Sequence, residues 1–318
     1  MPATLPDGSA WPRVSVVTPS YNQGQFIEET LRSVLLQGYL DLEYIVVDGG
    51  STDESVEIIR RYADHLAWWV SEPDGGQSEA INKGFARATG DIVAWLNSDD
   101  VYLPGAVHAS VAYLCAHPEV DLVHGDCTLV DAMGDTIGTY CGAPSSLKTL
   151  VTDYHRVRQP TVFLRSALLT RVGALRTDLH YAMDREWWTR MALAGARLAY
   201  LPGVRAWFRM HNTSKTVSAQ FRFLDEHEWL LDIFFARADL SSEHRSWNGL
   251  ARANLEIERG VALLQAGERG AAIGHLWRGA RLAPWRRRTL LALLLVLEAR
   301  SGFRIGSWAA SLKRRLAP

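Results

Sequence analysis

Short apolar runs alternate with segments of helical period along the first third of the chain. The apolar runs, each of a length that suits one buried strand, are Val14–Thr18, Tyr44–Val47, Leu66–Val70 and Asp91–Leu96. Between them, apolar residues recur every three or four positions in Phe26–Gln37, Ser51–Tyr62 and Ser78–Ala88. Strands that alternate with short helices predict an α/β fold with a mostly parallel sheet flanked by helices. A capping box at Ser51–Glu54 is expected to start the second helix.

The middle of the chain has a less regular pattern. The segment from Asp121 to Asp126 and the segment Thr136–Tyr140 are expected to pair as a hairpin around the turn at Asp131–Gly134. A helix rich in tryptophan is expected within Tyr181–Ala194, followed by a strand over Arg197–Phe208. These additional strands indicate that the sheet is not wholly parallel.

From about Phe221 onward the pattern is helical throughout. Leu255–Arg281 resembles one tetratricopeptide unit, with Pro284 just beyond it. Because such arrays normally need three or more copies, an all-helical extension that packs on the first domain is favoured over a binding array. We therefore expect two domains, an α/β domain over residues 1–218 and a helical C-terminal extension over residues 219–318.

Composition limits the classes of function. The formal net charge of −1 gives no support for a basic nucleic-acid-binding face, so no nucleic-acid partner is expected. The three cysteines lack metal-ligand spacing and are expected to be reduced thiols. Met1–Pro12 does not have the pattern of a signal peptide, and Leu290–Leu297 is shorter than the ~20 residues of a spanning helix. A cytoplasmic protein is expected, in which Trp285–Arg315 either lies at the inner face of a membrane or packs as an ordinary amphipathic helix.

The second, third and fourth expected strands run on to acidic residues, Asp48, Asp74 and Asp99. In a parallel sheet the carboxyl ends of the strands lie at one edge, where open α/β sheets bind ligands. Asn97–Asp100 adds an amide, a hydroxyl and two adjacent carboxylates, and Mg²⁺ or Mn²⁺ takes such oxygen donors together with substrate phosphates. A polar loop in which Asp99 or Asp100 caps a turn is the alternative. Three acids at one edge favour a ligand site.

Seven sequence blocks between Arg13 and Thr216 occur in a characteristic order. They are Val14–Gly24, Val46–Asp53, Ser71–Gly84, Leu96–Asp100, Arg158–Pro160, Met183–Trp188 and Arg209–Thr216. Together these blocks resemble the family-2 glycosyltransferases, which have the A-type nucleotide-sugar fold. The resemblance implies that fold for the matched region and leaves the helical extension unmatched.

The resemblance also implies where a nucleoside-diphosphate sugar binds. Thr18, Pro19 and Tyr21 match the loop under the nucleotide base. Asp48 matches the acid that hydrogen-bonds the base, and Asp74 matches the acid near the base and ribose. UDP is the expected nucleotide.

Asp99 matches the last acid of the family's D-x-D motif, which holds a divalent cation, Mn²⁺ or Mg²⁺, against the diphosphate. Asn97 replaces the usual first Asp; its amide can hydrogen-bond the sugar or ribose, but it carries no charge, so metal affinity is expected to be lower. Asp100 is then either an accessory ligand or a turn cap. In related enzymes the Arg209-x-His211 block closes over the diphosphate and can reach the metal. His211 is a metal candidate suited to Mn²⁺, with a structural histidine as the alternative.

Further candidates concern the diphosphate and the sugar. Arg209 and Lys215 are expected to bind the diphosphate, because cationic donors offset the charge of the leaving group. Lys83 is another such candidate, although a lysine on a helix face is usually solvated. Gln159 matches a family position near the sugar, and Ser98 lies inside the D-x-D block.

Asp184 matches the family's catalytic acid residue. A carboxylate there can take the proton of an acceptor hydroxyl, itself a poor nucleophile, as attack on the anomeric carbon develops. Asp184 also suits the start of the helix that follows, and the two roles are compatible. Glu186 is the competing base, and the motif alignment favours Asp184. Trp187 and Trp188 are expected in the core, although one of them is a candidate for lining the acceptor cleft.

These residues predict an inverting, metal-assisted glycosyltransferase with a saccharide or lipid-linked acceptor, acting in surface polysaccharide or glycolipid synthesis. One alternative is a catalytically silent glycosyltransferase-like protein that binds partners through its helical tail, which Asn97 and the tetratricopeptide-like segment would suit. A second is a sugar nucleotidyltransferase. That class is expected to carry a Gly-rich, basic loop after the first strand, whereas Pro19–Gly24 contains no Lys or Arg.

Overall fold

The computed structural model describes residues 4–5, 8–153, 156–284 and 294–296. The chain divides into two compact units, Met1–Ser146 with His155–Ser214, and Leu147–Tyr154 with Lys215–Pro318. The domain boundary expected after residue 218 stays a prediction. Of the basic segment Trp285–Arg315, all but residues 294–296 lies outside the described part.

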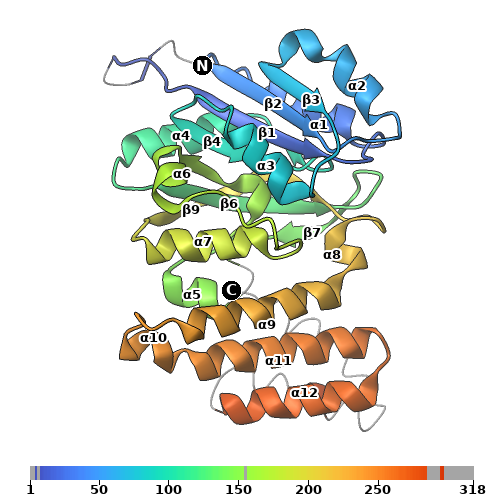
Figure 1. The fold of residues 1–318 in the computed structure, drawn as a ribbon, viewed down its shortest axis with the longest axis vertical. Coiled ribbons are helices and arrows are strands. Elements are labelled where there is room, and N and C mark those ends of the chain that lie inside the picture. Colours follow the sequence, from blue (N-terminus) through green and yellow to red (C-terminus); the bar gives the residue numbers. More distant parts are fainter. Residues whose placement is uncertain (1–3, 6–7, 154–155, 285–293, 297–318) are drawn as a thin grey trace. The chain divides into compact units, whose positions relative to one another are not determined.

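The first half of the sheet is parallel, as predicted (Figure 1). It consists of β1 (Val14–Ser20), β2 (Leu42–Asp48), β3 (Trp68–Ser71) and β4 (Ile92–Trp95). β1 lies in the centre, pairs with β2 and β4, and β2 pairs in turn with β3, all in parallel. All seven residues of β1 are buried because both faces of this strand are covered. The carboxyl ends of these strands therefore share one edge.

The second half of the sheet is mixed. Its strands are β5 (Val101–Tyr102), β6 (Leu122–Val130), β7 (Thr136–Tyr140), β8 (Phe163–Arg165) and β9 (Leu198–Arg209). The strand order is β3-β2-β1-β4-β8-β6-β9-β5, with β7 on β6. Here β8 runs antiparallel to β4 and β6, and β9 runs parallel to β6. The predicted hairpin is confirmed, since β6 and β7 pair antiparallel.

Helices cover the sheet and connect its strands. In the first unit they are α1 (Ile27–Leu35), α2 (Ser55–Arg61), η1 (Ala63–His65), α3 (Gln77–Phe85), α4 (Ala106–Ala116), η2 (Gln159–Thr161), α6 (Ala167–Val172) and α7 (Met183–Leu193). A side chain at Gly84 of α3 would meet Val17 of β1 at 2.3 Å. The glycine therefore lets α3, the helix that follows β3, pack closely against β1.

The predicted capping box at the start of α2 does not form. Ser51 donates its hydroxyl to Asp48 at 2.5 Å, so it is drawn toward the end of β2 instead of the helix. The helix begins at Ser55, and Asp53 accepts the Ser55 N–H at 2.9 Å. The acid at the end of the strand thus competes successfully for the serine.

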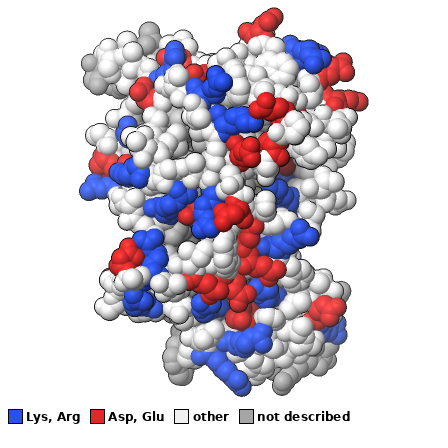
Figure 2. Space-filling model, in the orientation of Figure 1, with Lys and Arg blue, Asp and Glu red and all other residues white. Residues whose placement is uncertain are grey.

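The second unit is helical. It contains α5 (Leu147–Thr152), α8 (Lys215–Ser218), α9 (Gln220–Ala236), α10 (Ser242–Ser246), α11 (Asn248–Gln265) and α12 (Arg269–Leu282). α11 and α12 pack so closely that a Cβ at Gly260 would lie 2.7 Å from Leu276. Arg259 on α11 pairs with Asp225 and Glu228 on α9. In the lower part of Figure 2, acidic side chains gather in one group and basic side chains lie around it. Among the described residues, no helix has the length and apolar character needed to cross a membrane.

Candidate active site

The turn after β2 uses Asp48 as a hydrogen-bond acceptor within the protein. The carboxylate is fully buried. It accepts the Gly50 and Ser51 N–H groups at 3.1 and 2.8 Å, the Ser51 hydroxyl at 2.5 Å and the Ser71 hydroxyl at 2.7 Å. Both oxygens thus have protein donors, and the carboxylate shapes the turn.

The structure brings Asp74 next to this turn. A Cβ at Gly49 would lie 3.0 Å from the Asp74 carboxylate, so the two predicted acids belong to one corner of the site. Asp74 accepts the Gly76 N–H at 2.8 Å, and burial raises the pKa of its carboxyl. Lys83 donates to Glu72 at 2.7 Å, and this contact raises the pKa of its ammonium. A diphosphate contact for Lys83 stays a prediction.

The loop after β1 contains one exposed aromatic residue. Thr18 is buried, and its hydroxyl lies 2.9 Å from that of Tyr44. Pro19 is also buried, whereas Tyr21 is 61 % exposed. Of these three candidates, Tyr21 has the exposed side chain. The nucleotide-binding roles of all three residues stay predictions.

Asn97 lies at the centre of an amide network after β4. Its Oδ1 accepts from Gln77 at 2.8 Å. Its Nδ2 donates to Asp100 at 3.2 Å and to Gln159 at 3.0 Å, and Gln159 donates to the Trp95 carbonyl at 2.9 Å. A carboxylate at position 97 would lack the N–H donors that this network uses. Asn97 therefore suits a position beside a second acid, where two carboxylates would repel each other.

Asp100 turns inward and Ser98 is buried beside it. The Asp100 carboxylate accepts the Arg209 N–H at 3.0 Å in addition to the Asn97 amide. Burial and the neighbouring Asp99 carboxylate raise the pKa of Asp100 well above its ordinary value. These contacts give Asp100 a structural role in the loop, and an accessory metal role for it stays a prediction.

Asp99 and His211 meet although they are far apart in the sequence. Their closest atoms, Asp99 Oδ2 and His211 Nε2, are 3.0 Å apart. Antiparallel pairing of β5, which follows Asp99, with β9, which precedes His211, brings these segments together. The other imidazole nitrogen lies 2.8 Å from the Thr213 hydroxyl, and the ring packs on Phe26 with centroids 4.6 Å apart. The imidazole is therefore held toward the carboxylate.

Arg209 supports this loop from behind. The side chain is buried, donates from Nε to the Asp99 carbonyl at 3.0 Å and pairs with Glu29. It also donates to the carbonyls of Asp131 and Ala132, both at 3.3 Å. These donors serve the protein, so Arg209 braces the Asp99 loop. A direct contact between Arg209 and a diphosphate stays a prediction.

The donor set can be tested for its fit to a divalent cation. Within the described residues, no group of three or more His, Cys, Asp or Glu side chains forms a metal site. Mg²⁺ and its analogues, however, are commonly held by one or two carboxylates together with substrate phosphates. Asp99 is 19 % exposed, and the imidazole beside it is a nitrogen ligand that suits Mn²⁺. A carboxylate, an imidazole and a bound diphosphate together fit such an ion.

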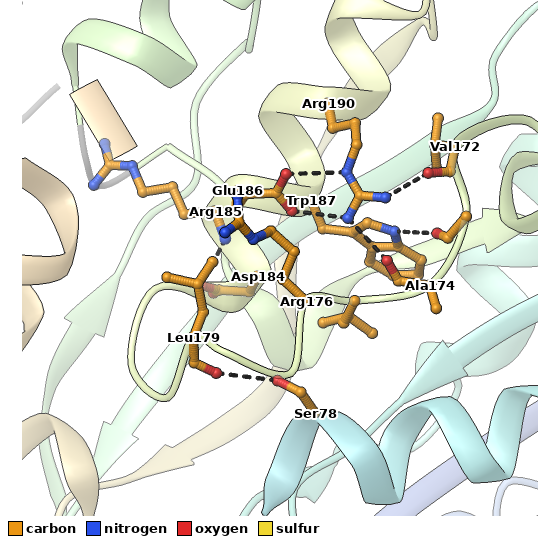
Figure 3. A network of polar contacts seen from close by, with 12 residues as sticks. Ser78, Val172, Ala174, Arg176, Leu179, Asp184, Arg185, Glu186, Trp187 and Arg190 are labelled. Atoms are coloured by element: carbon orange, nitrogen blue, oxygen red, sulfur yellow. Dashed lines mark hydrogen bonds and ion pairs between the residues drawn. The ribbon is translucent and has the colours of Figure 1, made fainter. Parts of the chain in front are cut away.

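Asp184 and Glu186 lie in the first turn of α7 and differ in their contacts (Figure 3). Glu186 forms a two-pronged pair with Arg190 at 3.0 and 2.8 Å, which commits both of its oxygens. Asp184 accepts the Arg185 N–H at 2.7 Å. It does not cap α7, because the helix begins at Met183 and the capping position is Ala182. The pair with Arg190 makes Glu186 the weaker candidate for a base.

The two tryptophans of α7 are core residues. Trp187 is fully buried, donates to the Gly173 carbonyl at 2.9 Å and packs near Trp95. Trp188 is 2 % exposed and stacks on Trp95 with ring centroids 5.4 Å apart. The core interpretation is thus confirmed for both residues.

Two candidates remain to be placed. Gln159 joins the site through the Asn97 amide. Lys215 is exposed and begins α8, in the second unit, and its diphosphate role stays a prediction. Sequence reasoning missed Gln77, the residue that orients Asn97. Its place in the block Ser71–Gly84, three residues after Asp74, was the available signal.

Comparison with known proteins agrees with this fold. The family model described as glycosyl transferase family 2 matches residues 15–138. An uncharacterized glycosyltransferase of Mycobacterium tuberculosis is 33 % identical over 184 residues, covering 57 % of this chain and 70 % of the relative. An uncharacterized glycosyltransferase of Rickettsia prowazekii is 29 % identical over 188 residues, 56 % of this chain and 58 % of its own length. The chain belongs to glycosyltransferase family 2, and it is a transferase.

Solved structures share the fold. TarS 1–349 of Staphylococcus aureus, in complex with UDP-GlcNAc, superimposes with a TM-score of 0.63 at 20 % identity, over 91 % of this chain and 87 % of that chain. The mannosyltransferase PcManGT of Pyrobaculum calidifontis, in complex with GDP-Man and Mn²⁺, gives 0.60 at 23 % identity, over 96 % and 87 %. The predicted α/β fold of the glycosyltransferase A type, with a helical C-terminal region, is confirmed.

Proposed function

We propose that this protein transfers a sugar from a nucleoside-diphosphate sugar to an acceptor hydroxyl with inversion at the anomeric carbon. The observation that carries the proposal is the Asp99–His211 pair: Asp99 follows β4, His211 follows β9, and their side chains lie 3.0 Å apart. Carboxyl ends of parallel strands are where α/β sheets bind ligands, and Asp48 and Asp74 lie at the same edge. Glycosyltransferase family membership supplies the reaction class.

Asp99 and His211 are the residues that would hold a divalent cation, preferably Mn²⁺. When bound, such an ion would act as a Lewis acid that stabilises the departing diphosphate. The buried Arg209 keeps the Asp99 backbone in place, and Phe26 and Thr213 orient the imidazole. This preorganised pair needs little rearrangement before the ligand binds.

Asp184 is the proposed general base. It would take the proton of the acceptor hydroxyl as the acceptor oxygen bonds to the anomeric carbon. The bond from that carbon to the diphosphate oxygen breaks, and the nucleoside diphosphate leaves with the electron pair. A single displacement of this kind inverts the anomeric centre. Glu186 is the weaker alternative because Arg190 already binds both of its oxygens.

Nucleotide and acceptor are proposed at a coarser level. TarS structures hold UDP-GlcNAc or UDP, and PcManGT holds GDP-Man, so a nucleotide-sugar donor is supported, and UDP is our proposal for the base. A saccharide or lipid-linked acceptor in surface polysaccharide or glycolipid synthesis follows from the family resemblance. Peripheral contact with the cytoplasmic face of a membrane through Trp285–Arg315 is part of this proposal.

A silent domain that acts through its helical tail is not favoured. Asn97, which motivated that alternative, has a structural reason here, because its amide donates to Asp100 and Gln159. The first position of the metal motif can therefore carry an amide while Asp99 keeps its contact with His211. A silent domain gives no reason for this arrangement.

Calorimetry with UDP, GDP and dTDP, each with and without Mn²⁺, tests the proposal. We expect one nucleotide, UDP, to bind in a metal-dependent way. Asp99→Ala should weaken that binding by at least about 100-fold, because the divalent cation would lose its carboxylate ligand. Absence of binding by all three nucleotides to the folded protein would overturn the proposal.

For the base, Asp184→Asn keeps the size of the side chain and removes its basicity. Metal-dependent UDP binding should persist, while turnover should fall by about 10²- to 10⁴-fold, the usual contribution of a general base. Turnover close to that of the wild type would remove Asp184 from this role without affecting the donor assignment.

A further inference from the structure

The segment Gly173–Ala182, here called the α6–α7 segment, leads directly into Asp184. It contains neither helix nor strand, so its backbone groups lack the partners that regular structure supplies. Side chains from two helices take their place, as Figure 3 shows. Side-chain hydrogen bonds therefore attach this segment, in place of the backbone hydrogen bonds that a helix or a sheet would supply.

From one side, α7 binds the beginning of this segment. Trp187 donates its indole N–H to the Gly173 carbonyl at 2.9 Å. Arg190 donates to the Ala174 carbonyl at 2.9 Å and also to the carbonyl of Val172, the last residue of α6. These contacts lie within the same helix that carries Asp184, so they fold the segment back onto α7.

From the other side, α3 binds the middle of the segment. Asn82 Nδ2 donates to the Leu175 carbonyl at 2.8 Å, and Asn82 Oδ1 accepts the Leu175 N–H at 2.9 Å. One turn earlier on α3, the Ser78 hydroxyl donates to the Leu179 carbonyl at 3.3 Å. Leu175 and Leu179 are buried, so both contacts lie beside anchored side chains.

The helix that makes these bonds starts at the nucleotide-sugar side of the site. Gly76, just before α3, donates to Asp74. A Cβ at Gly76 would lie 3.9 Å from the His180 imidazole, so the α6–α7 segment also passes close to this corner. The segment thus connects the proposed donor site with the helix that carries the proposed base.

We propose that Asn82 is a positioning residue of the reaction: it holds the α6–α7 segment to α3 and thereby sets Asp184 relative to the donor site. This inference rests on the proposed function of Asp184. An amide is the side chain that can both donate to and accept from one residue's backbone. The substitution Asn82→Asp would keep the acceptor but lose the donor, and Asn82→Ala loses both. A displacement of about 1 Å can lower turnover about 100-fold.

Hydrogen–deuterium exchange tests the attachment without any substrate. In Asn82→Ala, amides of residues 173–186, including that of Arg185 bonded to Asp184, should exchange at least about tenfold faster. Those of β1 and β4 should not change. Asn254→Ala is the matched control, because Asn254 is a buried amide in the second unit that donates to the Thr152 carbonyl at 2.6 Å. Unchanged exchange in residues 173–186, or an equal rise everywhere, would overturn the inference.

Kinetics separates this inference from the proposed function. Asn82→Asp and Asn82→Ala should lower kcat by about 10- to 100-fold and leave metal-dependent UDP binding within about twofold. In the Asp184→Asn background, Asn82→Ala should have no further effect on kcat, since Asn82 acts through the base. An equal loss in both backgrounds would overturn the positioning role and leave the base assignment standing. Full turnover of Asp184→Asn alone would instead overturn the base.

Discussion

The turn after β2 and the turn after β4 lie at the same edge of the sheet, and each follows a buried strand with a carboxylate. At the first turn, Asp48 is fully buried, and four protein donors occupy its oxygens. At the second, Asp99 is 19 % exposed, and within the described residues His211 is the side chain bonded to its carboxylate. Both carboxylates therefore follow the end of a strand, but the Asp99 carboxylate has the larger accessible surface. A hydrogen bond between Asp48 and a nucleotide base stays a prediction.

This difference separates two uses of the same residue type. A buried carboxylate whose two oxygens both accept from protein donors stabilises a turn, because replacing it leaves buried N–H and O–H groups without acceptors. A carboxylate with an accessible oxygen can exchange its partner for a cation. On α7, Arg190 likewise binds both oxygens of Glu186.

The largest expected effect comes from Asp99→Ala. Loss of a metal ligand should lower transfer by about 10⁴-fold, equivalent to about 5 kcal/mol of transition-state stabilisation. The free energy of unfolding should fall by only about 1 kcal/mol, the usual net contribution of one hydrogen bond, here that with His211. Turnover assays and urea unfolding check the two halves. Wild-type turnover by a folded variant would place Asp99 with Asp48 as a structural acid.

Asp48→Asn should show the opposite balance. Its amide group would point N–H donors at buried donors, so we expect a loss of about 3 kcal/mol in the free energy of unfolding. Urea unfolding of Asp48→Asn beside Asp99→Ala measures the contrast directly. If Asp48→Asn unfolded like the wild type but lost UDP binding, the carboxylate would act on the ligand rather than on the turn.

His124 extends the comparison to a group away from this edge. It is buried on β6, and burial lowers its pKa to about 3. The folded protein keeps the imidazole neutral, whereas the unfolded chain takes up a proton near pH 6.5. Stability is therefore full above that pH and falls as the pH drops toward 3, by about 2 kcal/mol between pH 7 and pH 5. Urea unfolding of the wild type and of His124→Gln at both pH values checks this. The loss of about 2 kcal/mol in the free energy of unfolding that His124 causes should be absent from the variant.

Glu186→Gln should have the smallest effect. Removing the charge from the pair with Arg190, which is partly exposed, should cost about 1 kcal/mol of stability. Turnover should not show the 10²- to 10⁴-fold loss of a general base. The Asp184→Asn enzyme, assayed in parallel, provides the reference, and a comparable loss in Glu186→Gln would reverse the two assignments.

The alternation of strands and helices could be predicted because it depends on local periodicity. β1, β2, β3 and β4 coincide with the apolar runs, and the turn at Asp131–Gly134 joins β6 and β7 into the hairpin. The capping box at Ser51 could not be excluded from local pattern. The Ser51 hydroxyl bonds to Asp48, the last residue of β2, and not to the backbone at the start of α2.

Local pattern was enough to establish the fold class, the edge where the acids gather and the residue types available there, because strand periodicity and the parallel connection place strand ends together. Which of those groups remain available to a ligand depends on contacts between distant segments. Arg209 braces the Asp99 loop because Glu29 and three carbonyls bind it, and Asn97 is oriented by Gln77. The chemistry of a side chain follows from its type, but its partners come from elsewhere in the chain, and buried donors and acceptors must be satisfied wherever the fold brings them.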